Sequence, residues 1–208
     1  MEDILLKYFP DLSQNQIEKY RSLTQIFPTW NEKVNLISRK DIQNLFIHHI
    51  LHSLSIGKVF RFPPSANIID VGTGGGFPGI PLAIMFPESN FDLTDSIGKK
   101  INVVKEITSH LELDNVKAIK SRSELLPAKY DFVISRAVTS FPEFMKISSN
   151  LIRKSPGNVE QGFIYLKGGD FEKELINFNN IQIYNIADLF EEDFFETKKI
   201  IYLAKKYK

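Results

Sequence analysis

One glycine-rich stretch combines residue types and a spacing that can do chemistry. An apolar run ends in Asp70, and glycine then occupies every second position, at Gly72, Gly74 and Gly76. A turn built from glycine lets the backbone approach a ligand, because no Cβ atom stands in the way. The apolar residues that follow predict a short helix, whose first N–H groups are free to bind. The pattern therefore predicts a nucleotide-like cofactor at the end of a buried strand.

The spacing of the acid and the glycines distinguishes between cofactors. The dinucleotide fingerprint is G-x-G-x-x-G, with a pyrophosphate at the helix N-terminus, and its third glycine would fall here at Phe77. Asp70 would repel a pyrophosphate, but it suits the cationic amino acid group of S-adenosylmethionine. Asp95, at the end of the next predicted strand, can accept hydrogen bonds from both ribose hydroxyls. These residues favour S-adenosylmethionine; the alternatives are a glycine turn without a ligand and a NAD-dependent oxidoreductase.

The elements that must position these residues alternate between strand and helix from Ala66 onward. Apolar runs predict strands at 66–71, 91–94, 116–119, 131–135, 162–167, 181–187 and 198–204. Helices are expected at 79–86, 98–111, 140–151 and 170–178, with a turn at 155–158. This alternation predicts an α/β fold with a mostly parallel sheet and helices on both faces. The last two strands lack a clear helix between them and predict an antiparallel C-terminal pair.

The first 60 residues show helical periodicity without strand alternation. Ser13-Gln-Asn-Gln16 is a capping-box pattern that opens one helix, and a second helical pattern runs from Asp41 to Leu54. The break Arg61-Phe-Pro-Pro-Ser65 follows. We therefore expect an N-terminal helical cap at 1–60 and a cofactor-binding domain at 61–208, which together form one compact unit.

Composition limits the class of protein. The chain of 208 residues has 43% hydrophobic and 25% charged residues, which suits one globular α/β domain with an additional element. No apolar run approaches the roughly 20 residues that a membrane helix needs, and the lack of cysteine excludes disulfides and thiolate metal sites. A net charge of +1 means that nucleic-acid binding would need a local basic patch. We expect a cytoplasmic monomer without membrane contact.

Several motifs, taken together, resemble one family. Asp70 to Leu82, which reads Asp-Val-Gly-Thr-Gly-x-Gly-x-Pro-Gly-Ile-Pro-Leu, is similar to the signature of the bacterial small-subunit rRNA guanine-N7 methyltransferases, the RsmG or GidB family. Six more segments resemble motifs of that family: Trp30-Asn31-x-x-x-Asn35-Leu36, His49-Ile-Leu-x-Ser53, Asp95-Ser-x-Gly-Lys-Lys100, Ser121-Arg-x-Glu124, Ile134-Ser-Arg-Ala137 and Leu166-Lys-Gly168. Ordered motifs over roughly residues 30 to 170 are far more specific than one glycine loop.

The resemblance implies a class I methyltransferase with a Rossmann-like fold. Members of the family transfer the methyl group of S-adenosylmethionine to N7 of a guanine in 16S rRNA of the small ribosomal subunit, at position 527 in the usual RNA numbering. The resemblance also implies cofactor contacts from Gly72 and Phe77 in the loop, from Ser123 and Glu124 beside the adenine, and from Arg136 after the fourth strand. The full predicted cofactor-binding set is Asp70, Gly72, Gly74, Gly76, Phe77, Asp95, Ser123, Glu124 and Arg136.

Methylation of guanine N7 needs no general base, because N7 carries a free lone pair at neutral pH. Catalysis then consists of holding N7 in line with the methyl–sulfur bond. Arg136 is the predicted catalytic residue in this positioning sense, through the cofactor carboxylate or the guanine O6; an ion pair at the strand end is its structural alternative. Glu124 could instead close a Ser121-x-x-Glu124 capping box. The predicted RNA contacts, for which a solvated surface position is the alternative, are Lys99, Lys100, Lys146 and Lys167.

Two histidines depart from the family pattern. The family usually has aspartate at the position of His52 and arginine at the position of His48, so a charge is changed or lost at each. The two histidines share a helix face, but no carboxylate or cysteine lies nearby in the sequence to complete a metal site, and we expect no metal. Phe77 and Phe141 could stack on a base, although a place in the core is favoured in a chain with 17 phenylalanines.

The sequence therefore predicts an rRNA guanine-N7 methyltransferase that uses S-adenosylmethionine and binds 16S rRNA in the small ribosomal subunit. Two other classes stay open. One is a class I methyltransferase acting on a small molecule or a protein, which the near-neutral net charge permits. The other is a non-enzymatic ribosome-assembly factor, against which the intact acids Asp70 and Asp95 argue.

Overall fold

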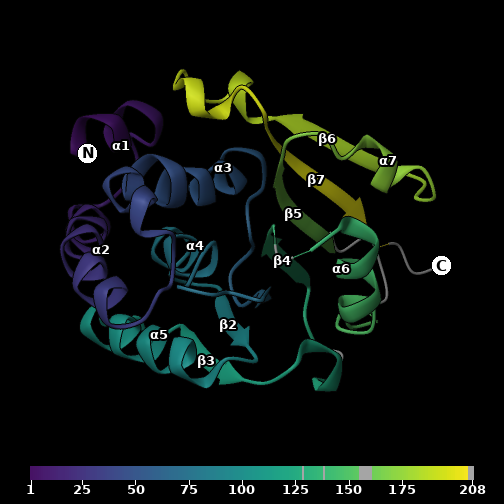
Figure 1. Cartoon of the computed structure of the whole chain (residues 1–208), viewed down its shortest axis with the longest axis horizontal. Coiled ribbons are helices and arrows are strands. Elements are labelled where there is room, and N and C mark those ends of the chain that lie inside the picture. Colours follow the sequence, from purple (N-terminus) through teal and green to yellow (C-terminus); the bar gives the residue numbers. More distant parts are fainter. Residues whose placement is uncertain (128, 138, 155–160, 206–208) are drawn as a thin grey trace.

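A seven-stranded sheet runs through the centre of the molecule in the order β3-β2-β1-β4-β5-β7-β6 (Figure 1). This computed structural model describes residues 1–127, 129–137, 139–154 and 161–205, so the turn predicted at 155–158 lies outside the described residues. The strands are β1 (Asn67–Val71), β2 (Asn90–Asp95), β3 (Val116–Lys120), β4 (Phe132–Arg136), β5 (Gly162–Gly168), β6 (Ile181–Asn185) and β7 (Lys198–Ala204). Each of the seven predicted strands is confirmed.

The sheet is parallel except at its C-terminal end. Strands β3, β2, β1, β4 and β5 pair in parallel, whereas β7 runs antiparallel to both β5 and β6. The first four residues of β4 are buried, as expected for a parallel strand covered on both faces. The predicted antiparallel C-terminal pair is also confirmed, and β7 lies between β5 and β6.

Only helices and connecting turns occur in the first 60 residues. They are α1 (Glu2–Tyr8), α2 (Gln14–Lys33), η1 (Arg39–Asn44), η2 (Leu45–Leu51) and α3 (His52–Val59). The capping box at the start of α2 is present, with Ser13 and Gln16 bonded to each other's backbone. The helix predicted from Asp41 changes its hydrogen-bonding pattern twice, because η1 is a 3-10 helix, η2 is a π-helix and α3 is an α-helix.

The remaining helices connect the strands. They are α4 (Gly79–Met85), α5 (Gly98–His110), the short η3 (Ser123–Leu125), α6 (Phe141–Ser148), α7 (Glu172–Leu175), η4 (Ile186–Asp188) and η5 (Asp193–Phe195). Helix α7 is shorter than the predicted 170–178. Asn180 has a left-handed φ of 62° just before β6, so the segment after Leu175 turns into the strand instead of extending the helix.

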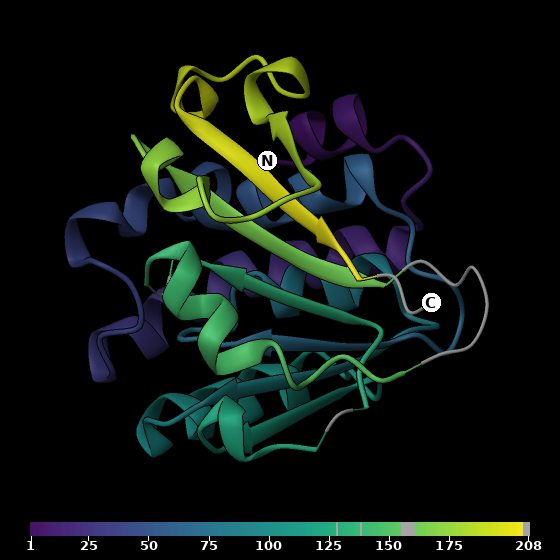
Figure 2. The same cartoon turned by 90° about the vertical axis from the view of Figure 1, so that its right-hand side faces the viewer.

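Two helical layers cover the sheet, as Figures 1 and 2 show. Ile68 of β1 and Ile134 of β4 pack in one hydrophobic cluster with α1 to α5, whereas Ile69 and Val133 pack in another with α6. Alternate side chains of a strand point to opposite faces, which explains this division. The first cluster joins residues on both sides of position 60. The division into a cap and a second domain stays a prediction.

The parallel strands end at one common edge of the sheet. The order reverses between β1 and β4, and open α/β sheets bind ligands at such a reversal, outside the carboxyl ends of the strands. Val71, Asp95 and Arg136 are the last residues of β1, β2 and β4. The fold therefore brings the predicted site residues to this edge. No helix among the described residues is long and apolar enough to span a membrane.

Candidate active site

The glycine loop between β1 and α4 adopts a backbone conformation that other residues rarely take. Gly72, Gly74 and Gly76 have φ angles of 69°, 58° and 96°, which lie in the left-handed region that favours glycine. A Cβ atom on Gly76 would also lie 2.3 Å from Cδ1 of Ile80. The alternating glycines are therefore required by the path of the loop.

Asp70 holds this loop against the start of α4. Its Oδ2 accepts a hydrogen bond from Oγ1 of Thr73 at 2.6 Å and another from the Gly79 N–H at 2.9 Å. The side chain is fully buried, and burial raises the pKa of Asp70 to about 7. Its Oδ1 is buried without a hydrogen-bond partner among the described residues. Asp70 thus holds the loop in place through these two buried hydrogen bonds. Its direct contact with a cofactor stays a prediction.

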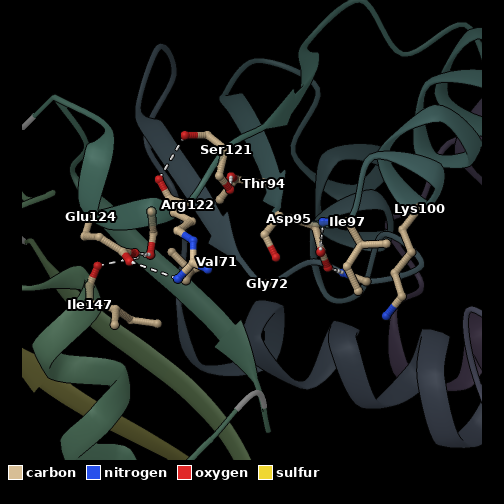
Figure 3. A pocket seen from close by; sticks show the side chains of 13 residues that line it. Val71, Gly72, Thr94, Asp95, Ile97, Lys100, Ser121, Arg122, Glu124 and Ile147 are labelled. Carbon is tan, nitrogen blue, oxygen red and sulfur yellow. Dashed lines mark hydrogen bonds and ion pairs between the residues drawn. The ribbon is translucent and has the colours of Figure 1, made fainter.

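A cavity of about 440 Å³ opens on the other side of the loop (Figure 3). Five predicted cofactor residues line it, namely Gly72, Gly74, Asp95, Ser123 and Glu124. Its other lining residues are Val71, Thr94, Ser96, Ile97, Lys100, Ser121, Arg122 and Ile147. The carboxyl ends of β1, β2 and β3 therefore converge on one cavity, with α6 supplying part of its wall.

Asp95 links the glycine loop to the start of α5. Its Oδ2 accepts a hydrogen bond from the Gly74 N–H at 3.1 Å, and its Oδ1 accepts one from the Ile97 N–H at 2.8 Å. Each carboxylate oxygen has a second lone pair. The side chain can therefore accept further hydrogen bonds from a ligand in the cavity, as the predicted ribose contact requires.

The wall opposite Asp95 is built by η3. The Ser123 hydroxyl lies 3.1 Å from the Ile147 carbonyl oxygen and 3.3 Å from Oε2 of Glu124, and it can donate its one proton to either oxygen. The alternative capping box is wrong, because Arg122 and not Ser121 is the N-cap residue of η3 and no side chain caps this helix; Ser121 donates to the Arg122 carbonyl at 2.9 Å. Glu124 is thus available to the cavity.

The predicted RNA lysines have different surroundings. Lys99 is exposed, whereas Lys100 lines the cavity. Lys146 is exposed and lies 3.7 Å from Glu143 on the same helix. Lys167 is only 13% exposed, and its Nζ lies 2.5 Å from Glu174 Oε2. The ion pair explains its burial, and Lys99 and Lys146 remain the exposed candidates.

Arg136 is not among the residues that line the cavity and faces η2 of the N-terminal helical segment, residues 1–60. Its Nη1 donates to the His48 carbonyl at 3.2 Å, and its Nη2 lies 2.9 Å from Nδ1 of His49. Burial lowers the pKa of Arg136 to about 10, so the side chain stays cationic at neutral pH. Asp41 and His49, which the predicted site omits, are therefore close to a predicted site residue. The motif His49-Ile-Leu-x-Ser53 was the sequence signal for this region.

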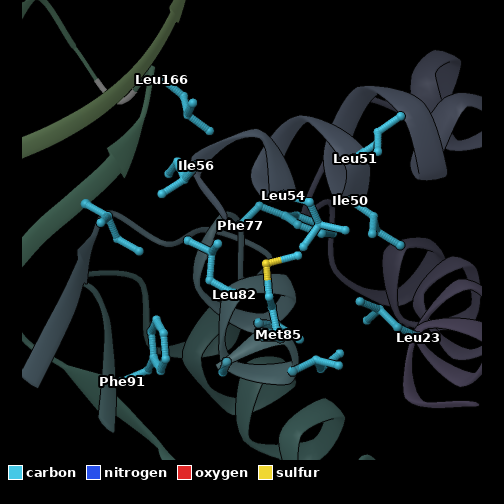
Figure 4. Packing of buried hydrophobic residues seen from close by; sticks show 14 of the residues in the cluster. Leu23, Ile50, Leu51, Leu54, Ile56, Phe77, Leu82, Met85, Phe91 and Leu166 are labelled. Carbon is cyan, nitrogen blue, oxygen red and sulfur yellow. The ribbon is translucent and has the colours of Figure 1, made fainter. Parts of the chain in front are cut away.

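Phe77 also lies away from the cavity. It is 3% exposed and packs in the core near Leu54 and Met85 (Figure 4). Its ring centroid lies 5.1 Å from that of Phe27 and 5.2 Å from Cζ of Arg136. The core position expected as the alternative for Phe77 is therefore present, and it places an aromatic face beside the arginine.

The two histidines that depart from the family pattern pack against η5. The His48 ring stacks on Phe194 with centroids 3.8 Å apart, whereas His52 meets Phe194 edge-on at 5.7 Å. Burial lowers the pKa of His52, and its Nε2 is buried without a described partner. Among the described residues, no group of three or more histidine, aspartate or glutamate side chains is arranged to hold a metal ion.

Two solved structures that share this fold are named as SAM-dependent methyltransferases. A SAM-dependent O-methyltransferase from Thermotoga maritima matches 81% of this chain and 71% of its own, with a TM-score of 0.59 and 13% identity. A SAM-dependent methyltransferase from Aquifex aeolicus matches 81% of this chain and 98% of its own, with a TM-score of 0.56 and 16% identity. The strand order, with the glycine loop and Asp95 at the ends of β1 and β2, is that of the class I methyltransferase fold.

The particular family follows from sequence. Residues 16–199 match the GidB family, described as rRNA small subunit methyltransferase G, and the chain belongs to this family. A protein named Ribosomal RNA small subunit methyltransferase G from Flavobacterium johnsoniae is 50% identical over 207 residues, which are 99% of each chain. One with the same name from Bacteroides thetaiotaomicron is 48% identical over 202 residues, or 96% of this chain and 98% of its own. The predicted fold, family and cofactor are confirmed.

Proposed function

We propose that this chain transfers the methyl group of S-adenosylmethionine to N7 of a guanine in 16S rRNA, the guanine that the family numbers 527. The cavity at the carboxyl ends of β1, β2 and β3 is the observation that carries the proposal. Full-length similarity to proteins named as small subunit rRNA methyltransferases supports the RNA as substrate. A cytoplasmic monomer that acts on the small ribosomal subunit completes the proposal.

The residues around the cavity fit the cofactor. Gly72 and Gly74 leave the backbone open on one side, and the carboxylate of Asp95 offers hydrogen-bond acceptors for ribose hydroxyls. Ile97 and Ile147 supply apolar surface for a purine ring. When bound, S-adenosylmethionine supplies an electrophilic methyl group on a cationic sulfur. The role of the protein is to hold this methyl group and the guanine in the correct relative position.

Methyl transfer to guanine N7 needs little from acidic or basic side chains of the protein. Guanine N7 attacks with its own lone pair, so the protein must provide proximity and orientation and needs no proton acceptor for this step. Arg136 stays cationic beside the glycine loop, and a hydrogen bond from its guanidinium to guanine O6 would leave N7 free. The target base must be unpaired or turned out of its helix to reach the site.

Two exposed basic residues support binding of RNA beside the cavity. Lys99 lies in the first turn of α5, next to the cavity residue Lys100. Arg122 lines the cavity, with its side chain 73% exposed. Phosphate contacts of this kind hold an RNA in place without reading its sequence. We expect the RNA backbone to cross the mouth of the cavity between these two side chains.

Methyl transfer to purified RNA tests the proposal. Small ribosomal subunits and free 16S rRNA that lack the modification are incubated with labelled S-adenosylmethionine, and the product is mapped by cleavage specific for N7-methylguanine. We expect one labelled guanine, and its loss in the variant Asp95→Ala. Asp114→Ala, which changes an exposed acid outside the cavity, serves as control. Tight cofactor binding without transfer to either RNA would contradict the RNA as substrate.

A further inference from the structure

Three side chains form a continuous chain from the helical segment to the end of β4. Asp41 of η1 lies 2.7 Å from Nε2 of His49 through its Oδ2, and Nδ1 of His49 lies 2.9 Å from Nη2 of Arg136. The other carboxylate oxygen of Asp41 lies 2.6 Å from Nδ1 of His48. These hydrogen bonds therefore link η1, η2 and β4, although Asp41 and Arg136 lie far apart in the sequence.

The direction of each hydrogen bond follows from Arg136. A guanidinium carries five N–H donors and no acceptor, so Nδ1 of His49 must present its lone pair to Nη2. The proton of a neutral imidazole then lies on Nε2, where it donates to Asp41. Burial and Arg136 lower the pKa of His49 to about 4, which agrees with a neutral ring. The geometry thus selects one tautomer of His49.

The guanidinium is held on two further sides. Nη1 donates to the His48 carbonyl, and Cζ lies over the Phe77 ring, 5.2 Å from its centroid. The two hydrogen-bond acceptors, the His48 carbonyl and Nδ1 of His49, both belong to η2, a π-helix that also places His48 and His49 against the same carboxylate. Single π-turns inside helices occur frequently at functional sites. The hydrogen bonds to the His48 carbonyl and to His49 use two of the five N–H groups of Arg136. The other three carry no hydrogen bond to the described residues.

We propose that Asp41 and His49 are positioning residues for methyl transfer, which hold Arg136 so that its remaining N–H groups face the acceptor guanine beside the glycine loop. Arg136 lies near the glycine loop, because its Cζ is 5.2 Å from the ring centroid of Phe77, the residue after Gly76, and its charge acts on the pKa of Asp70, the residue before the loop. An arginine free to rotate would also donate to guanine N7, as in the usual bidentate contact, and would block the attacking lone pair. The restraint therefore favours contact with O6. This inference rests on the proposed function.

Two amide substitutions separate the two ends of His49. In His49→Asn the amide oxygen can take the place of Nδ1, so the acceptor for Arg136 is kept and the donor to Asp41 is lost. In His49→Gln the amide nitrogen can take the place of Nε2, so the donor to Asp41 is kept and the acceptor is lost. Neither change alters the charge at neutral pH. His110→Gln is the matched control, because His110 is exposed and contacts Ser22 instead.

The readout is single-turnover methyl transfer to small ribosomal subunits, with the KM for the subunit and the cofactor Kd measured alongside. We expect His49→Gln to lower the rate about 10- to 100-fold with unchanged KM and Kd, and His49→Asn to keep most of the rate.

Arg136→Lys should be as slow alone as with His49→Gln, because both act through one contact. Equal rates for the two amide variants, or additive losses, would overturn the proposal. If His49→Gln does not fold, Asp41→Asn is tested in its place. An unchanged rate in Asp41→Asn would contradict the proposed role of the hydrogen bonds that link Asp41, His49 and Arg136.

A second readout is independent of activity. The ring nitrogens of His49, observed by 15N NMR, should show a neutral ring with the proton on Nε2 between pH 5 and pH 8. A ring protonated on Nδ1 would overturn the inference even if the enzyme methylates rRNA. Wild-type protein that shows the expected tautomer but transfers no methyl group would instead contradict the proposed function.

Discussion

The backbone N–H of Gly79 donates a hydrogen bond of 2.9 Å to Oδ2 of Asp70, nine residues earlier in the chain. This contact closes the glycine loop onto the start of α4. Thr73 donates to the same oxygen from within the loop. One buried carboxylate therefore determines the position of the backbone that forms one side of the cavity, and the loop can be tested through either partner.

Gly79→Ala should destabilise the protein. The added Cβ would lie 2.0 Å from Cδ2 of Leu93 and 2.9 Å from Oδ2 of Asp70, and such overpacking costs about 1–3 kcal/mol. Urea unfolding followed by circular dichroism measures the change. Gly98→Ala is the control, because its Cβ would meet only the flexible end of Lys120 at 3.1 Å. A Gly79→Ala variant as stable as Gly98→Ala would contradict the described closure.

Asp95→Asn should weaken cofactor binding while the fold is kept. The amide can still accept one hydrogen bond through its oxygen, but it loses an acceptor facing Gly74 or Ile97 and the negative charge. We expect the Kd for S-adenosylhomocysteine to rise about 10- to 100-fold, which corresponds to roughly 1.4–2.8 kcal/mol. Titration calorimetry measures it, with Asp114→Asn as the unchanged control. A Kd equal to that of the wild type would place the ribose elsewhere.

Charge reversal at the neighbouring lysines should separate RNA binding from cofactor binding. Lys99 is exposed beside the cavity, whereas Lys100 lines it. We therefore expect Lys99→Glu to weaken binding of the small subunit and leave the cofactor Kd unchanged, whereas Lys100→Glu should weaken both. Filter binding at two salt concentrations and calorimetry distinguish the effects. Lys117→Glu, on the exposed part of β3, is the control. The same profile for both variants would contradict this division.

His49 should make stability depend on pH below neutrality. Burial and Arg136 lower its pKa from 6.5 to about 4, against the opposing effect of Asp41. The unfolded chain then binds a proton at this site that the folded chain does not, so stability falls as the pH drops from about 6.5 to about 4. A shift of this size corresponds to roughly 3 kcal/mol. The measurement is the free energy of unfolding at a series of pH values.

The difference between wild type and His49→Gln isolates this contribution. Other buried groups titrate as well: the pKa of His52 is lowered and acts in the same direction, whereas the pKa of Asp70 is raised to about 7 and opposes it. The neighbouring His48 also faces His49. We expect the advantage of the wild type to shrink as the pH falls toward 4. A constant difference across that range would mean that His49 does not titrate as described.

The elements and the cofactor class were predictable from local pattern. Apolar runs locate the central strands β1, β4 and β5, because a strand buried between two layers of helices must be apolar along its length, whereas the edge strands β3 and β6 are partly exposed. The glycines of the loop can be recognised individually, since a left-handed φ at Gly72 and Gly76 leaves little other choice. Asp95 follows the next strand and was predicted to lie at the same edge, which parallel pairing with β1 brings about.

The tertiary structure decided which groups meet across the chain. Phe77 follows the glycine loop directly but points into the core, and Lys167 forms an ion pair with Glu174. Asp41 and Arg136 come together through His49 because η2 packs against the end of β4. Periodicity describes the faces of one helix or strand and carries no information on which distant element covers it. The sequence by itself determined the fold class and the cofactor loop, and the packing of the helical segment on the sheet determined the surroundings of Arg136.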